Sequence, residues 1–194
     1  MRIFIALDID DAIRECLQRF LDGVQEFAPN ARWVRPESMH VTLKFIGEKS
    51  SEAVEEVKRA LADLRVGACE ISFRGYGFFP SSKAPRVFWV GIEAGPQLAE
   101  LAKAVDEATA AQGVPKEEHA FSPHLTLARR GGSGAPGRQK GDGPNREFQR
   151  LQEKLAILPA PEFGTMTARE FFLYQSQLMR GGSRYTKIER FGLA

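Results

Sequence analysis

Histidine and cysteine are scarce in this chain of 194 residues, which holds three histidines and two cysteines. Cys16 and Cys69 match no ligand spacing of a zinc site, and nothing requires them to pair. Cys16 falls on the apolar stripe of an expected helix, so we expect it to be a small buried hydrophobic residue. Unpaired cysteines favour a reducing, cytoplasmic location.

Other familiar patterns are also missing. No apolar run approaches the roughly 20 residues that span a membrane, and the chain opens with a strand pattern at Arg2–Leu7 in place of a signal peptide, so we expect no membrane association. No P-loop, Gly-x-Gly-x-x-Gly or Cys-x-x-Cys pattern occurs. The net charge of +2 is too small to indicate nucleic-acid binding by itself.

Two of the three histidines lie in copies of one tetrapeptide, His40-Val41-Thr42-Leu43 and His124-Leu125-Thr126-Leu127. Side chains alternate between the two faces of a strand. In each copy the histidine and threonine therefore share one face, and the two apolar residues share the other. Each copy predicts a strand with an apolar back and a polar front.

The repetition extends upstream at the same offset (124 − 40 = 84), since Arg2-Ile3-Phe4 aligns with Arg86-Val87-Phe88. We interpret the pattern as an internal duplication, with repeats at about 2–47 and 86–130 inside a single domain over 1–194. Two lobes related by a pseudo-two-fold axis would place the polar fronts face to face across a V-shaped cleft.

Hydrophobic periodicity predicts an α+β fold with mainly antiparallel sheets, because helices and strands mix without strict alternation. Expected helices follow the first strand, occupy about 51–64, run from Leu98 to near Gly113, and surround Phe148–Leu155. Further strands are expected at about 70–79, 87–92, 166–176 and 184–191, and Gly181-Gly182 predicts a hairpin between the last two. Residues 129–145 are rich in glycine and carry Arg129, Arg130, Arg138 and Lys140, which predicts a mobile basic loop.

Paired imidazoles across a cleft suit general acid and base catalysis, because imidazole has a pKa near about 6.5. Thr42 and Thr126 can donate hydrogen bonds to phosphate oxygens. Lys44 has the strand parity of His40, and Arg130 has that of His124, so both are candidate phosphate-binding cations. Arg129 reaches the cleft only if the strand ends before it. Two histidines without a nearby carboxylate or thiolate do not make a zinc site, so we expect no metal and no cofactor.

The chain resembles the 2H phosphoesterases, and within them the bacterial and archaeal RNA 2′,3′-cyclic phosphodiesterases of the 2′-5′ RNA ligase type. The resemblance covers essentially the whole chain. It rests on both tetrapeptides and on their flanks: Arg2–Asp8, Arg32–Pro36, Lys44–Gly47, Gly75–Pro80, Pro85–Trp89, Pro123, Ala128-Arg129 and Phe172–Ser176.

This resemblance implies a bilobal fold and metal-independent hydrolysis of RNA 2′,3′-cyclic phosphate ends to 2′-phosphomonoesters. It implies His40 as proton donor, His124 as proton acceptor, and Thr42 and Thr126 as ligands of the phosphate oxygens. Reversible 2′-5′ RNA ligation is associated with the same chemistry. RNA with a 2′,3′-cyclic phosphate end or a cyclic nucleotide is the expected partner, and we expect a monomer.

Two alternatives stay open from the sequence. One is a non-catalytic nucleotide- or RNA-binding module, although both histidine–threonine pairs are intact. The other is a phosphodiesterase for a different cyclic substrate, such as ADP-ribose 1″,2″-cyclic phosphate. Several aromatic residues are candidates for stacking on a base, although a place in the core suits each of them: Trp33, Phe45, Phe79, Tyr174 and Tyr185.

Overall fold

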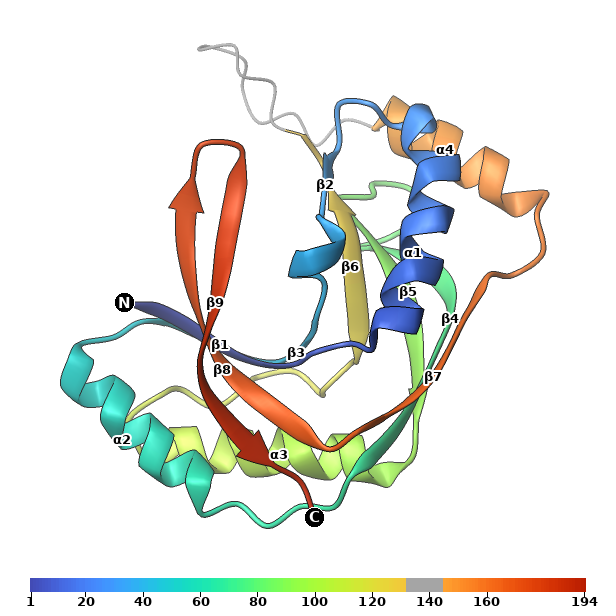
Figure 1. The fold of residues 1–194 in the computed structure, drawn as a ribbon. Helices are drawn as coiled ribbons and strands as arrows, with labels where there is room; N and C mark the ends of the chain where they lie inside the picture. Colours follow the sequence, from blue (N-terminus) through green and yellow to red (C-terminus); the bar gives the residue numbers. More distant parts are fainter. Residues whose placement is uncertain (132–144) are drawn as a thin grey trace.

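Two antiparallel β-sheets form the framework in the computed structural model, which describes residues 1–131 and 145–194 (Figure 1). Most of the predicted basic loop, including Arg138 and Lys140, lies outside the described residues. The first sheet has the order β3 (Val41–Glu48), β1 (Arg2–Leu7), β8 (Glu170–Met179), β9 (Gly182–Gly192). The second has the order β2 (Arg32–Trp33), β6 (His124–Arg129), β5 (Val87–Ala94), β4 (Cys69–Phe79), β7 (Glu162–Ala168).

The four predicted helices are confirmed, and each buries an apolar stripe. The helices α1 (Asp11–Val24) and α3 (Pro96–Ala110) pack against β7 and β3, respectively, and α2 (Ser51–Ala62) packs beside α3. The last helix, α4 (Arg146–Ala156), contacts the short helix η1 (Gln25–Phe27); a second short helix, η2 (Pro36–Ser38), precedes β3. Side-chain oxygens of Ser50 and Asn145 accept hydrogen bonds from the first turns of α2 and α4.

The sheet orders correspond strand by strand, because β3–β1–β8–β9 matches β6–β5–β4–β7. In both sheets the motif strand pairs with the strand that opens its half of the chain. Some of the remaining strands do not stay with their own half of the chain. Strand β4 follows the first half in sequence but joins the second sheet. Strands β8 and β9 follow the second half in sequence but join the first sheet. The predicted α+β class with two similar lobes is confirmed. The repeat boundaries and the single domain stay predictions.

Strand β1 is buried on both faces, as its unbroken apolar sequence predicts. Ile3, Ile5 and Leu7 belong to the main core, which joins both sheets and the helices. Phe4 and Ala6 face the other way, into a smaller cluster that they form with Phe172 and Tyr174, and Tyr185 packs against this cluster. Burying a side chain of this kind stabilises the fold by roughly 1.5–3 kcal/mol. The first sheet is therefore fixed from both sides.

The predicted strand at 166–176 is wrong in its extent, because it is two strands in different sheets. Strand β7 ends at Ala168 and β8 begins at Glu170, so the chain crosses between sheets at Arg169. Only two polar residues, Arg169 and Glu170, separate the apolar residues of the two strands, and no glycine or proline marks the break. Cys16 is half-buried, contrary to the prediction of a buried residue, while Cys69 is buried. No helix in the described ranges is long and apolar enough to cross a membrane.

Candidate active site

Both motif strands contain a β-bulge at the same place. In the first sheet Ala6 pairs with Thr42 and Ile5 with Lys44, so Leu43 is an extra residue. In the second sheet Trp89 pairs with Thr126 and Phe88 with Ala128, so Leu127 is the extra residue. The two leucines are separated by the offset of the sequence repeat (127 − 43 = 84). A bulge reverses the alternation of side chains beyond it, and bulges are frequent next to active sites.

This reversal makes the expectation for Lys44 wrong. Lys44 lies on the core face, where its side chain is 1% exposed, and it does not share the face of His40 and Thr42. Its Nζ donates hydrogen bonds to the Asp106 carboxylate on α3 and, at 2.7 Å, to the carbonyl oxygen of Pro115. Burial is the largest single cause and acts to raise the pKa of Asp106, but the hydrogen bonds from Lys44 and the Glu117 N–H, with the charges of Lys44 and Lys116, together lower it. Lys44 therefore joins β3 to α3.

The same reversal decides between the two arginines of the second motif. Ala128 is buried in the main core, and the next residue, Arg129, turns to the cleft and lines a cavity with both histidines. Arg130 follows the end of β6, where its backbone N–H donates to the carbonyl oxygen of Arg86 at 2.8 Å. Arg130 lines neither of the two cavities found beside the histidines, contrary to its predicted parity.

Each motif histidine is held by the same hydrogen bond. Nδ1 of His40 lies 2.8 Å from the carbonyl oxygen of Ser38, and Nδ1 of His124 lies 2.9 Å from that of Ser122. A carbonyl oxygen only accepts, so Nδ1 carries the hydrogen in both rings. Nε2 is therefore the nitrogen left for a substrate, with a free lone pair when the ring is neutral. The two serines also correspond in the repeat (122 − 38 = 84).

A small cavity brings the two motifs together. It has a volume of about 70 Å³, and its walls contain His40 and Thr42 from the first motif with His124, Thr126 and Arg129 from the second. The expected meeting of the two polar fronts is confirmed by this arrangement. The cavity offers two imidazoles, two hydroxyl donors and one guanidinium within the space of a phosphate-sized group. Such a set suits an anion at which a proton is both given and taken.

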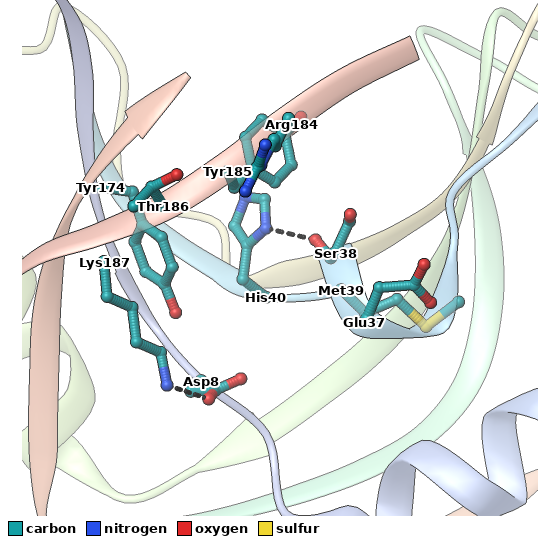
Figure 2. Close-up of a pocket in the computed structure, with 10 residues that line it drawn as sticks. All are labelled: Asp8, Glu37, Ser38, Met39, His40, Tyr174, Arg184, Tyr185, Thr186 and Lys187. Atoms are coloured by element: carbon teal, nitrogen blue, oxygen red, sulfur yellow. Dashed lines mark hydrogen bonds and ion pairs between the residues drawn. The ribbon is translucent and has the colours of Figure 1, made fainter. Parts of the chain in front are cut away.

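A second cavity of about 380 Å³ adjoins the first on the side of His40 (Figure 2). The two cavities share Ser38, Met39, His40 and Tyr185. The His40 ring packs against Phe4 at a centroid distance of 4.8 Å and edge-on against Tyr185 at 5.2 Å. His40 therefore stands in an aromatic wall of the first sheet, between the small cavity and the large one.

Asp8 lies in the wall of the large cavity at the end of β1. Its carboxylate accepts a hydrogen bond from Lys187 at 2.5 Å, drawn in Figure 2, and others from Arg14 at 2.8 Å and the Ile9 N–H at 2.9 Å. Burial acts to raise the pKa of Asp8, but these donors together lower it. Asp8 is thus an ionised carboxylate held by two cations beside His40.

The pKa of His40 is lowered. Burial is the largest cause, because it disfavours the charged imidazolium, and the positive charge of Arg129 and the second histidine act in the same direction. The Ser38 carbonyl and the negative charge of Asp8 oppose this by favouring the protonated ring. Asp8 also acts with burial to raise the pKa of Tyr174, whose phenol stays protonated. A bound anion would restore part of the lost stability of the His40 imidazolium.

His124 has different neighbours. Its ring packs edge-on against Phe79 at 5.1 Å and lies 6.4 Å from Trp89. The Trp89 indole covers Gly77, where an added Cβ would lie 2.1 Å from the ring, so only glycine permits this close approach. In the described chain, Trp89 Nε1 is buried with no hydrogen-bond partner. The position that corresponds to Asp8 in the repeat is Ile92 (8 + 84 = 92), so the repeat supplies no carboxylate at that place in the second lobe.

The sequence interpretation missed Asp8 as a site residue, together with Arg184, Thr186 and Lys187 of β9. The opening Arg2–Asp8 segment matches the family flanks, and this was the one available signal for Asp8. The residues of β9 carry no local signal, because they reach His40 only through the order of the first sheet. Within residues 1–131 and 145–194, no three histidine, cysteine, aspartate or glutamate side chains are grouped as metal ligands would be.

Comparison with known proteins places the chain in a family. The model of the LigT-like phosphoesterases matches residues 7–89 and again 90–185, and the chain belongs to this family. RNA 2′,3′-cyclic phosphodiesterases of Archaeoglobus fulgidus and Methanothermobacter thermautotrophicus are 32% and 31% identical, over 98% and 100% of this chain and 99% of each relative. The crystal structure of Escherichia coli LigT complexed with 3′-AMP superposes with a TM-score of 0.77 at 26% identity, covering 99% of this chain and 97% of that one.

We predict that replacing Lys44 with methionine destabilises the fold. Asp106 would lose the partner of its partly buried carboxylate, and breaking such a pair costs about 3 kcal/mol of unfolding free energy. Urea unfolding of Lys44→Met measures this loss. The control is Lys103→Met on the same helix that Asp106 occupies, where the side chain is 78% exposed and little change is expected. If Lys44→Met were as stable as the unaltered protein but bound substrate more weakly, Lys44 would be a substrate-binding residue, contrary to this prediction.

We also predict that the His40 ring titrates below the ordinary histidine value of about 6.5. Burial removes water from the imidazolium, so the ring stays neutral to a lower pH than in an unfolded chain. Nitrogen-15 NMR of the ring through a pH titration gives the midpoint and also reports which nitrogen carries the hydrogen. A midpoint at or above the ordinary value, or a neutral ring protonated at Nε2, would contradict the geometry described above.

Proposed function

We propose that the protein hydrolyses RNA 2′,3′-cyclic phosphate ends to 2′-phosphomonoesters without a metal ion. The observation that carries this proposal is the single small cavity that both histidine–threonine pairs and Arg129 line, with Nε2 as the available nitrogen of each ring. Membership of the LigT-like phosphoesterases and full-length similarity to RNA 2′,3′-cyclic phosphodiesterases support it. The 3′-AMP bound by the E. coli relative supports a nucleotide as the substrate class.

The reaction needs one proton to be taken and one to be given. His124 Nε2 accepts a proton from water as the water oxygen attacks phosphorus. The bond from phosphorus to O3′ breaks, and O3′ takes a proton from the Nε2–H of His40. The product is a 2′-phosphate, and solvent exchange resets the two rings. Each such transfer contributes on the order of 10²–10⁴-fold in rate.

Thr42, Thr126 and Arg129 stabilise the charge that develops on the non-bridging oxygens. The two hydroxyls donate from opposite lobes, and Arg129 supplies a positive charge from the wall of the same cavity. A 5′-hydroxyl in the place of water would open the same ring through the same groups: the bond from phosphorus to O5′ forms, the bond to O3′ breaks, and the product is a 2′-5′ bond. We propose this ligation as a minor reaction of the same site.

The order of the two roles follows from Asp8. The two histidines have the same hydrogen bond and the same neighbouring threonine, so the motifs alone leave their roles exchangeable. Burial lowers the pKa of His40 overall. The Ser38 carbonyl and Asp8 oppose this shift, and of these two only Asp8 lacks a counterpart in the repeat, where Ile92 takes its position. We assign the donor role to His40 on this asymmetry.

His40→Ala and His124→Ala are each expected to lower turnover by at least about 10²-fold, because each removes one proton transfer. The assay uses an oligonucleotide that ends in a 2′,3′-cyclic phosphate, in EDTA, with phosphorus NMR of the product. Thr42→Ala and Thr126→Ala are the graded comparison: each loses one hydrogen bond to a charged group, roughly 1.5–3 kcal/mol.

A 3′-phosphate product would show that O2′, and not O3′, is the leaving oxygen. Loss of activity in EDTA that added metal restores would contradict the metal-free mechanism. Binding of the oligonucleotide without turnover would instead favour a binding module, and turnover of ADP-ribose 1″,2″-cyclic phosphate alone would favour the other cyclic substrate.

Asp8→Asn is expected to lower the pKa of His40 further, because it removes the negative charge that favours the imidazolium. The limb of the kcat/KM profile that depends on His40 then moves to lower pH, and turnover at neutral pH falls. The matched control is Asp11→Asn, which removes a carboxylate that is 98% exposed and also lies near Arg14. A profile that does not move, or one in which His124 shifts instead, would remove the basis for the assignment.

A further inference from the structure

The large cavity beside His40 lies where the proposed chemistry requires the nucleoside. This inference rests on the proposed function. Displacement at phosphorus places the attacking and leaving oxygens on opposite sides. If His40 gives its proton to O3′, the ribose that carries O3′ lies on the side of His40, and water enters from the side of His124. The terminal base and the rest of the RNA then extend away from His124.

The cavity on that side fits in size and position. Its volume of about 380 Å³ is within the range of about 300–1,000 Å³ of sites that hold small organic ligands. The small cavity of about 70 Å³ has no room for a nucleoside beside the phosphate. His124, Thr126 and Arg129 do not line the large cavity, so an occupant would contact the first lobe alone.

Tyr185 is the wall shared by both cavities, and it can serve as a platform for the base. Its ring meets His40 and Phe4 edge-on, at 5.2 Å and 5.1 Å, and it is half-buried, so part of the ring remains open to the cavity. Unpaired bases of RNA are commonly bound by stacking on an aromatic side chain. Stacking tolerates any base, because every base has an aromatic face.

The rims of the cavity carry opposite charges, which sets the direction of the RNA backbone. Strand β9 contributes Arg184 and Lys187, whereas η2 contributes Glu37 (Figure 2). Lys187 is bound to Asp8, while the side chain of Arg184 makes no hydrogen bond or ion pair with another residue of the described chain. Beyond Arg184, the guanidinium of Arg35 lies beside Gly181 in the β8–β9 turn. A phosphodiester is attracted to the β9 rim and repelled by Glu37.

We propose that the large cavity binds the 3′-terminal nucleoside of the RNA, with its base on Tyr185, and that Arg184 binds the phosphodiester on the 5′ side of that nucleoside. The RNA then leaves the site along the β8–β9 hairpin. Arg184 is on this basis a residue that favours RNA ends over cyclic mononucleotides, because a mononucleotide has no 5′ phosphodiester to offer.

The test compares two substrates in one set of variants. One is a nucleoside 2′,3′-cyclic monophosphate with a free 5′-hydroxyl, and the other is a dinucleotide that ends in the same cyclic nucleotide. Arg184→Gln is expected to lower kcat/KM about tenfold for the dinucleotide, the equivalent of about 1.4 kcal/mol, and to leave the mononucleotide unchanged. Arg190→Gln is the control, because it makes the same change on the same strand at a residue that binds Glu170 and lies outside the cavity wall.

The outcomes separate the two proposals. If the unaltered protein turns over neither substrate, the proposed function fails. If it turns over both but Arg184→Gln affects them equally, or affects neither, the inference about the RNA path is overturned. A loss for the dinucleotide in Arg190→Gln as large as that in Arg184→Gln would also overturn it, because the effect would then reflect the net charge of the strand.

Discussion

The bond from each imidazole Nδ1 to a carbonyl oxygen two residues earlier is the contact on which the site depends. It fixes the tautomer, the ring orientation and the nitrogen that is offered to a substrate. Both carbonyls belong to serines at equivalent places in the repeat, Ser38 and Ser122, so one local arrangement was used twice. Because backbone atoms provide this support, the rings need no carboxylate partner, and the cavity between them stays favourable for an anion.

The internal repeat made most of this arrangement predictable. Alternation correctly placed His40, Thr42, His124 and Thr126 on facing strands, because those four residues precede the bulges. Beyond each bulge the same rule fails, which is why Lys44 is in the core and Arg129, rather than Arg130, faces the cavity. The extra residue of each bulge is an ordinary leucine, so a single sequence does not reveal the bulge. Side-chain alternation therefore predicts the facing of residues correctly only as far as the threonine of each motif.

Contacts that depend on which strands are neighbours in a sheet could not be predicted from the sequence, for a different reason. Tyr185 and Lys187 reach Asp8 and His40 because β8 and β9 join β1, nearly the whole chain length away. Sequence patterns report the period and burial of a strand, and these were recognised for β9. They do not report its neighbour. The β8–β9 hairpin, which follows the second half of the chain but joins the first sheet, therefore supplied a wall of the site that no local pattern contained.

The near-symmetry of the two motifs brings two imidazoles together, but it does not by itself distinguish their roles. A pseudo-two-fold pair of imidazoles can exchange roles, whereas the proposed hydrolysis needs one ring to give a proton and the other to take one. The difference lies outside the motifs, where the first lobe has Asp8 and the large cavity and the second has Ile92 and the wall of Phe79 and Trp89. The charge of Asp8 opposes the lowering of the His40 pKa by burial, and in the proposed reaction the large cavity beside the same ring admits the leaving group. Because both asymmetries fall on His40, the proposed donor role rests on them, and the repeat alone would leave the two roles ambiguous.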